Sequence, residues 1–113
     1  IDGYTNHIWH GVTTLQFAEF CSRIIREHLF DALRADGYVL HFVPNAPCTK
    51  YDLLCAIRDV LGKRLTIEST AHTQPTRRIL TMRSMTLRAL LGPSQSIARG
   101  IEALVTPPID TRG

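Results

Sequence analysis

The stretch Trp9-His10-Gly11-Val12-Thr13-Thr14-Leu15 decides how the fold begins. A bulky aromatic residue and a glycine come directly before two threonines. Thr13 or Thr14 is the expected N-cap, because a threonine hydroxyl accepts a hydrogen bond from an otherwise unpaired amide in the first turn of a helix. The pattern predicts an amphipathic helix from about Thr14 to about Leu33, ended by Asp36-Gly37. Its apolar residues recur at helical spacing, at Leu15, Ala18, Cys21, Ile24 and Ile25.

Three further helices are predicted from local start and stop signals. The segment 49–52, Thr-Lys-Tyr-Asp, is a variant of the capping box that opens a helix, and Gly62 is placed to end it. A third helix is predicted over Met85–Leu91, with Ser84 as its cap and Gly92-Pro93 as its end. A fourth is predicted from the helical spacing of Ile97, Ile101, Leu104 and Val105, and Pro107-Pro108 should end it.

Two short strands complete the expected fold. Residues 37–43 are apolar on both faces apart from His41, which predicts a strand buried on two sides with His41 as a hydrogen-bonded core residue. Residues 64–68 alternate polar and apolar and predict a half-exposed strand, whereas the polar residues 69–78 predict a loop. The chain is therefore expected to be a single α/β (α+β) domain over residues 1–113, a small helix-rich lobe with three to four helices and two short strands.

Composition indicates an ordinary globular protein. Of the 113 residues, 44% are hydrophobic and 20% are charged. No apolar run approaches the roughly 18 residues of a membrane span, and no signal peptide precedes the first helix, so the expected location is the cytoplasm. The odd number of cysteines argues against a disulfide scaffold. Five histidines and three cysteines show no zinc-type spacing, so we expect no metal, and Cys21 and Cys55 on apolar helix faces are expected in the core.

Charge is distributed unevenly along the chain. Residues 1–62 carry 5 basic and 7 acidic side chains, whereas residues 63–113 carry 8 basic and 3 acidic ones. A basic half can attract phosphates or nucleic acid, or it can simply be a solvated surface. Every aromatic residue precedes position 52, so the stacking pattern typical of nucleic-acid binding is missing from the basic half. On the first helix, Glu19 and Arg23 are spaced to form an i,i+4 ion pair.

Four stretches, in order and over residues 5–105, resemble the dTDP-dehydrorhamnose reductase-like branch of the extended short-chain dehydrogenases, relatives of the NAD-dependent epimerases and dehydratases. Trp9–Leu15 is similar to the Trp-Asn-Gly-Val-Thr-Thr-Leu segment that opens the substrate-binding part of these enzymes. The other three are His41-Phe42-Val43-Pro44, Thr49-Lys50-Tyr51-Asp52-Leu53-Leu54 and Thr76-Arg77-Arg78-Ile79-Leu80.

The resemblance implies a Rossmann domain that carries a nicotinamide cofactor, followed by a smaller lobe that closes over a nucleotide sugar. Only the smaller lobe resembles this chain. The glycine-rich motif that lets a backbone approach a pyrophosphate is missing from the 113 residues. The Tyr-x-x-x-Lys of the family is missing too, because Tyr4, Tyr38 and Tyr51 have no lysine four positions later. We therefore expect no catalytic residue and no cofactor in this chain, with NAD(P) implied for a full-length parent.

The resemblance implies that the substrate-binding residues are Trp9, His10, Thr13, Arg77 and Arg78. Free amides at a helix start favour anions, and arginines make bidentate contacts with phosphate oxygens. Two residues depart from the family, since His10 stands where Asn is usual and Arg77 where Asp is usual. The alternative is structural: Trp9 as a hydrophobic staple, Thr14 as a cap only, and Arg77, Arg78 and Arg83 as an exposed basic loop.

These observations lead to one expected function and two alternatives. The expected function is the substrate-binding lobe, detached or truncated, of an NAD(P)-dependent nucleotide-sugar oxidoreductase or epimerase of dTDP-dehydrorhamnose reductase type. Its partners would be a nucleoside-diphosphate sugar and the Rossmann domain of the parent or of a partner chain. The first alternative is a non-catalytic interaction or assembly module, including a homo-oligomer. The second is a basic nucleic-acid-binding domain.

Overall fold

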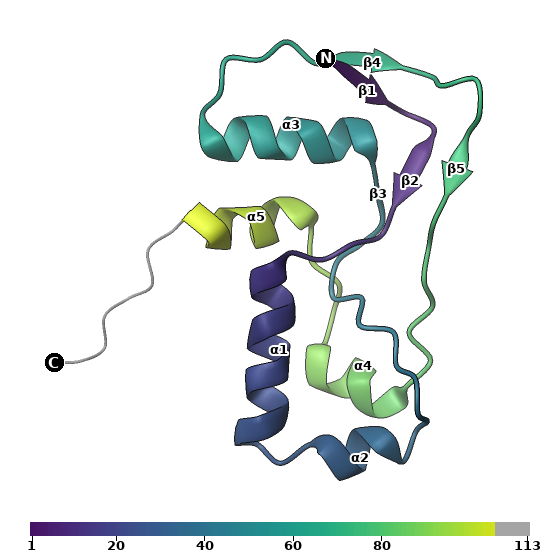
Figure 1. Ribbon diagram of the computed structural model, residues 1–113, viewed down its shortest axis with the longest axis vertical. Helices are drawn as coiled ribbons and strands as arrows, with labels where there is room; N and C mark the ends of the chain where they lie inside the picture. Colours follow the sequence, from purple (N-terminus) through teal and green to yellow (C-terminus); the bar gives the residue numbers. More distant parts are fainter. Residues whose placement is uncertain (106–113) are drawn as a thin grey trace, which may run out of the picture.

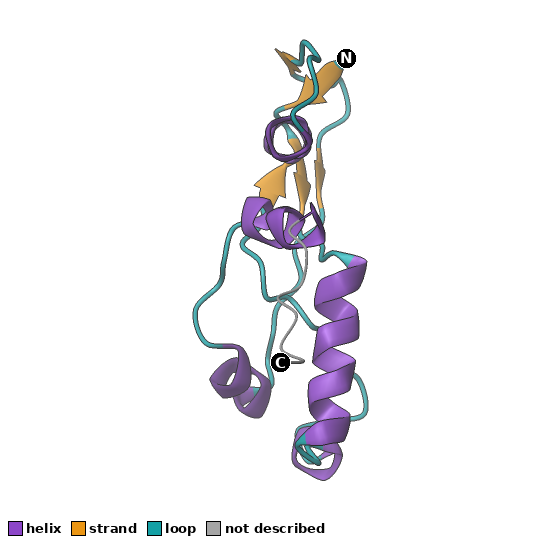
Figure 2. Ribbon diagram, turned by 90° about the vertical axis from the view of Figure 1, so that its left-hand side faces the viewer, coloured by secondary structure: helices purple, strands orange, loops and turns teal. Residues whose placement is uncertain are grey.

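A computed structural model describes residues 1–105, in which helices and very short strands form a thin slab (Figures 1 and 2). Its extents are 45 × 42 × 18 Å, and its radius of gyration is 16.6 Å against roughly 13 Å for a compact domain of this length. The elements are β1 (Asp2–Tyr4), β2 (His7–Trp9), α1 (Thr14–Arg26), α2 (Phe30–Arg34), β3 (Cys48–Thr49), α3 (Lys50–Leu61), β4 (Glu68–Thr70), β5 (Thr76–Arg77), α4 (Met85–Leu91) and α5 (Ile97–Val105).

The strands form two small sheets in the upper half of Figure 1. β1 pairs in parallel with β4, and β2 is the central strand of a second sheet with order β3-β2-β5. In that sheet β3 runs antiparallel and β5 parallel to β2. α3 packs against α5 and against β1. The fold is mixed α/β, as the sequence predicts.

The predicted helix starts are confirmed, because each depends on a side chain close in sequence. The hydroxyls of Thr13, Thr49 and Ser84 accept hydrogen bonds from the first turns of α1, α3 and α4. At the far end of α3, Gly62 has φ +65°, a left-handed conformation that a glycine adopts without a Cβ clash. Local capping chemistry therefore sets the starts of α1, α3 and α4 and the end of α3.

The first helix is shorter than predicted. α1 ends at Arg26, and His28 takes a left-handed backbone conformation with φ +53°. The Leu29 amide donates to the Ile24 carbonyl at 3.0 Å, a bond typical of a Schellman-type helix end. The residues up to Arg34 then form the separate helix α2. The apolar periodicity continues across the break, which is why it predicted one continuous helix.

The predicted strand over residues 37–43 is wrong. The segment is extended but lies outside both sheets, and only Val43 of this stretch is buried. His41 is exposed rather than in the core, and its Nδ1 lies 3.3 Å from the Thr81 carbonyl. An apolar stretch becomes a strand only where another backbone pairs with it, and none of residues 1–105 does so here. We call this segment the strap.

The second predicted strand is displaced rather than absent. Residues 64–67 are irregular and β4 begins at Glu68, where it pairs with β1. The predicted loop 69–78 therefore contains the last part of β4 and the whole of β5. The strands β1, β2 and β3 are too short to leave a periodic pattern.

The core is small for a chain of this length. The buried hydrophobic residues among those described are Leu33, Val43, Leu87, Ile97 and Ile101. The cysteines expected in the core, Cys21 and Cys55, are only half-buried. No helix in the described part of the chain is long and apolar enough to span a bilayer. The predicted stop at Pro107-Pro108 lies outside the described residues.

Candidate functional site

Strand pairing brings the two halves of the expected site together (Figure 1). β5 lies beside β2, with Arg77 opposite Ile8 in the parallel register. The Arg78 amide continues this pairing by donating to the Ile8 carbonyl at 3.1 Å. Residues 76–83, which we call the arginine segment, therefore start alongside the strand that ends at Trp9.

His10 links the arginine segment to Asn45, two residues beyond the strap. Its Nδ1 accepts a hydrogen bond from the Leu80 amide at 3.2 Å. The proton of the neutral ring therefore sits on Nε2, which donates to the Asn45 carbonyl at 2.7 Å. Both ring nitrogens are engaged with the backbone, so a ligand could bind His10 only by displacing one of these contacts.

Trp9 lies against the backbone of its own turn and lines an apolar groove. A Cβ at Gly11 would lie 1.8 Å from Cζ2 of Trp9, so the indole packs where only a glycine leaves room. The groove has a volume of about 410 Å³ and runs between α3 and α5, where Ile57 and Ile101 also line it. This placement agrees with the packing alternative for Trp9.

Thr13 acts as the N-cap of α1 within a reciprocal capping box. Its hydroxyl accepts from the Gln16 amide at 3.1 Å, and the Gln16 side chain accepts from the Thr13 amide at 2.9 Å. Thr14, the other candidate cap, is the first residue of the helix. The Thr13 hydroxyl is thus committed to the helix start.

The arginine segment supplies the two arginines of the expected site, Arg77 and Arg78, and also Arg83. Arg77, Arg78 and Arg83 are exposed, and none forms an ion pair within residues 1–105. Successive residues of an extended segment point to opposite faces. We therefore expect Arg77 and Arg78 to reach opposite sides of the sheet, so that a single phosphate group meets only one of them.

A pocket of about 500 Å³ lies between the strap and the arginine segment, with Arg83 on its rim. The acidic group that lines it is Asp36, whose carboxylate accepts from the Ser84 hydroxyl and from the Thr86 amide. The Ser84 hydrogen bond, and then those from Thr86, hold the pKa of Asp36 below its usual range. That carboxylate stays ionised and bound to the start of α4, while the Arg83 guanidinium remains available.

A buried amide pair is the part of the site that sequence reasoning missed. Asn45 is 1% exposed, and its Nδ2 donates to the Gly11 carbonyl at 3.0 Å and to Gln16 Oε1 at 2.8 Å. Gln16 Nε2 donates back to Asn45 Oδ1 at 2.8 Å. The pair ties the Trp9–Gly11 turn to α1 and to the residues just after the strap. One signal was present in the sequence: a polar Asn between Pro44 and Ala46 at the end of an apolar run.

The remaining histidines and the cysteines do not assemble into a ligand set. Within residues 1–105, no group of three His, Cys, Asp or Glu side chains is placed to hold a metal ion. Tyr4, His7 and His72 instead pack ring against ring, with centroids 4.8–4.9 Å apart. Burial, and then the charge of Asp52, raises the pKa of the Cys48 thiol above its usual value.

Comparison with known proteins identifies a fold relative. No family model matches the chain, and no curated protein sequence matches it. The structure is similar to the crystal structure of a dTDP-4-dehydrorhamnose reductase from Clostridium acetobutylicum ATCC 824, with a TM-score of 0.62 and 12% identity over 91% of this chain. The match covers 36% of the reductase, so the chain spans about a third of that protein's length. At this identity the likeness shows the fold alone: the chain folds like part of a reductase.

Proposed function

We propose that this chain is the substrate-binding lobe of an NAD(P)-dependent nucleotide-sugar oxidoreductase of dTDP-dehydrorhamnose reductase type. The observation that carries the proposal is the backbone match, since nine-tenths of the chain superimposes on about a third of a reductase. The order of sequence motifs supports it independently. The cofactor and the proton relay would then belong to another part of the enzyme, because the 113 residues contain neither a glycine-rich dinucleotide motif nor Tyr-x-x-x-Lys.

The substrate contact is assigned to the arginine segment. A guanidinium presents several N–H donors in a planar fork that matches two oxygens of a diphosphate. Arg78 is the preferred residue, because it aligns with the Arg of the family motif and is anchored through its own amide to β2. His10 and Thr13 would shape the wall beside it rather than bind the substrate through hydrogen bonds, since their side-chain polar atoms already serve the fold. Trp9 would contribute its indole, which packs against Gly11.

The test is a titration of the chain with dTDP-glucose, followed by ¹H–¹⁵N NMR at low salt. We expect shifts concentrated at residues 76–83 and at the Trp9–Gly11 turn. Arg78→Gln should weaken binding at least about tenfold, in line with the loss of a charge-assisted contact. NAD(H), titrated in parallel, should not bind stoichiometrically.

Two matched arginines serve as controls. Arg77→Gln makes the same change on the neighbouring residue, which we expect on the opposite face, and Arg26→Gln makes it on an exposed part of α1. Both variants should bind within about threefold of the unmodified chain. Equal losses in all three variants would show a non-specific charge effect, and tight binding of NAD(H) by the chain alone would contradict the assignment.

A second candidate function is an assembly module, and an exposed apolar patch favours it. Around the start of α2 and the strap, Phe30 is 62% and Tyr38 88% exposed, and both line an open apolar groove. Asp31 and Arg34 lie on the same helix and form no ion pair within the described residues. Opposite charges at the edge of one patch suit a two-fold contact, in which each copy's Asp31 meets the other's Arg34.

A second copy of the chain is thus the expected occupant of that patch. Light scattering should show a dimer at micromolar concentration, and Phe30→Asp should convert it to a monomer. Met85→Asp, at an exposed apolar residue on α4, should leave the dimer intact. A monomer at all accessible concentrations would exclude this second function and leave the first untouched.

A further inference from the structure

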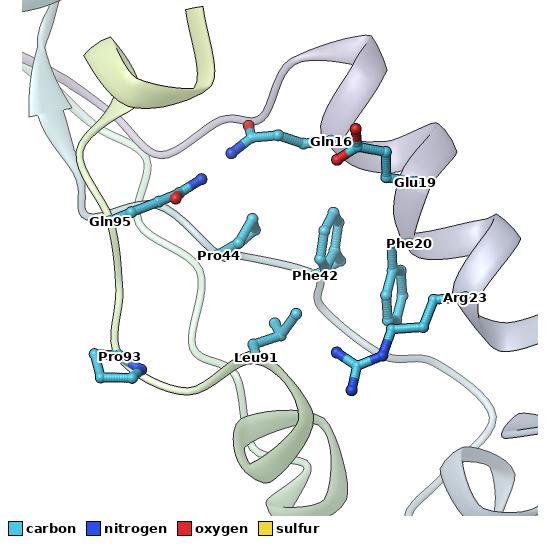
Figure 3. Close-up of a pocket in the computed structure, with 9 residues that line it drawn as sticks. All are labelled: Gln16, Glu19, Phe20, Arg23, Phe42, Pro44, Leu91, Pro93 and Gln95. Atoms are coloured by element: carbon cyan, nitrogen blue, oxygen red, sulfur yellow. The ribbon is translucent and has the colours of Figure 1, made fainter. Parts of the chain in front are cut away.

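A further cleft, separate from the arginine segment, opens between α1, the end of the strap and the segment that joins α4 to α5 (Figure 3). Its volume is about 260 Å³. That is below the range of about 300–1,000 Å³ typical of drug-sized ligands, so it suits one ring system rather than a whole nucleotide sugar. Arg77, Arg78 and Arg83 do not line it.

Part of the cleft wall is flat and apolar. Phe42 lies between Phe20 and Pro44 in Figure 3, and its ring is stacked on Phe20 at 4.3 Å between centroids with a 6° angle between planes. Leu91 closes the lower side of the same surface. The stack fixes the orientation of the Phe42 ring relative to Phe20. A rigid aromatic and proline surface of this kind favours contact with a flat ring.

The polar rim of the cleft carries one free carboxylate. The ion pair predicted between Glu19 and Arg23 does not form, because Arg23 Nε instead binds Glu27 at 2.8 Å and Arg23 Nη1 donates to the Leu90 carbonyl at 2.8 Å. Arg23 also lines the cleft, and the Glu27 carboxylate compensates its charge. Glu19 has no hydrogen-bond partner within residues 1–105, so its carboxylate can accept N–H donors of a ligand.

A carboxamide faces this carboxylate across the cleft. Gln95 lies on the opposite side from Glu19 in Figure 3, with Pro44 and Phe42 between them. The Gln95 backbone is fixed by hydrogen bonds to Pro44 and Ala46, at 3.0 Å and 2.8 Å. Its side-chain amide is not bonded to any described residue and can therefore donate to an acceptor on a ligand.

We propose that this cleft binds a guanine base, with its ring on the Phe42–Pro44 surface and its two adjacent N–H groups donating to Glu19. Guanine matches the cleft in three ways. Its flat face can lie on the aromatic surface, and its two neighbouring N–H donors match the two oxygens of one carboxylate. Its acceptors at O6 and N7 can bind the amide of Gln95. Thymine and uracil offer a single ring N–H, and adenine lacks the N1–H donor.

The proposal does not rest on the substrate assigned to the arginine segment. Guanosine carries no phosphate, so its measured affinity contains no phosphate contact with Arg78. Failure with dTDP-glucose therefore leaves this inference intact, and failure with guanosine leaves the diphosphate contact intact.

The test is a ¹H–¹⁵N NMR titration with guanosine, inosine, adenosine and thymidine. Guanosine should shift resonances of residues 16–23, 42–44 and 91–95. Inosine, which lacks only the exocyclic amine, should bind about tenfold more weakly, and adenosine and thymidine more weakly still. Glu19→Gln should weaken guanosine binding at least about tenfold and should remove most of the preference over inosine.

Two further variants test whether the effect is specific to this cleft. Glu68→Gln makes the same chemical change on exposed β4, away from the cleft, and should bind guanosine as the unmodified chain does. Gln95→Ala should weaken binding about three- to fivefold without altering the fold, because the backbone of Gln95 makes the structural contacts. Absence of guanosine binding, equal binding of inosine, or an unaffected Glu19→Gln variant would overturn the proposal. So would equally strong binding of benzylamine, which would indicate a simple cation site.

Discussion

Asn45→Ala is expected to lower the free energy of unfolding by about 3 kcal/mol. The side chain is buried, and its removal leaves the Gly11 carbonyl and both polar atoms of the Gln16 carboxamide without one of their partners. Buried polar groups that lose their partners cost more than the average hydrogen bond contributes, because water cannot replace the missing contact. Urea unfolding followed by circular dichroism at 222 nm measures the change.

A double-mutant cycle separates the amide pair from the rest of the network. Gln16→Ala removes the partner of Asn45, so the two substitutions together should cost clearly less than the sum of the single effects. Gln74→Ala is the control, because that side chain is exposed and forms no hydrogen bond within residues 1–105; it should cost less than about 0.5 kcal/mol. Additive effects of Asn45→Ala and Gln16→Ala would show that the two amides do not act as a pair.

Leu87→Ala is expected to have an effect of similar size, a loss of about 3 kcal/mol. Leu87 is fully buried at 0% exposure on α4, which packs against α2, where Leu33 is also buried. Truncation removes apolar contact area and leaves a cavity, and a slab with so small a core has few neighbouring side chains that could fill it. The same urea experiment reports the loss.

Met85→Ala on the same helix is the matched control for Leu87. Met85 is 79% exposed and loses little contact with the protein when it is shortened, so its variant should unfold within about 0.5 kcal/mol of the unmodified chain. If Leu87→Ala also stayed within that margin, the contact between α2 and α4 would not contribute to the stability of the fold.

The helices of this protein were predictable because their signals are local. A threonine or serine hydroxyl and the amide it caps lie three residues apart, and a glycine end signal acts on the turn just before it, so the starts at Thr13, Thr49 and Ser84 could be read from neighbouring residues. The end of α1 was not predictable from periodicity. It depends on the left-handed backbone of His28, a residue without the glycine that usually marks such a position.

Among the expected site residues, too, only the local contacts could be predicted from the sequence. Thr13 was recognisable as a cap from sequence, but the dual hydrogen bonding of His10 and the contact between the Trp9 indole and Gly11 were not. The free carboxylate of Glu19 was mispredicted, because Arg23 has acidic residues both four positions before it and four positions after it. Helical spacing allows both pairs, and only the structure shows which one forms.

Signals between neighbouring residues were sufficient to predict the starts of α1, α3 and α4, the mixed α/β class and the resemblance to a reductase lobe. The tertiary structure alone decided where backbone pairs with backbone: it placed Arg77 beside Ile8, joined β1 to β4 and left the apolar strap outside both sheets. The physical reason is the range of the interactions. A cap is satisfied within one turn of chain, whereas each two- or three-residue strand exists only because a partner about forty to seventy residues away supplies its hydrogen bonds.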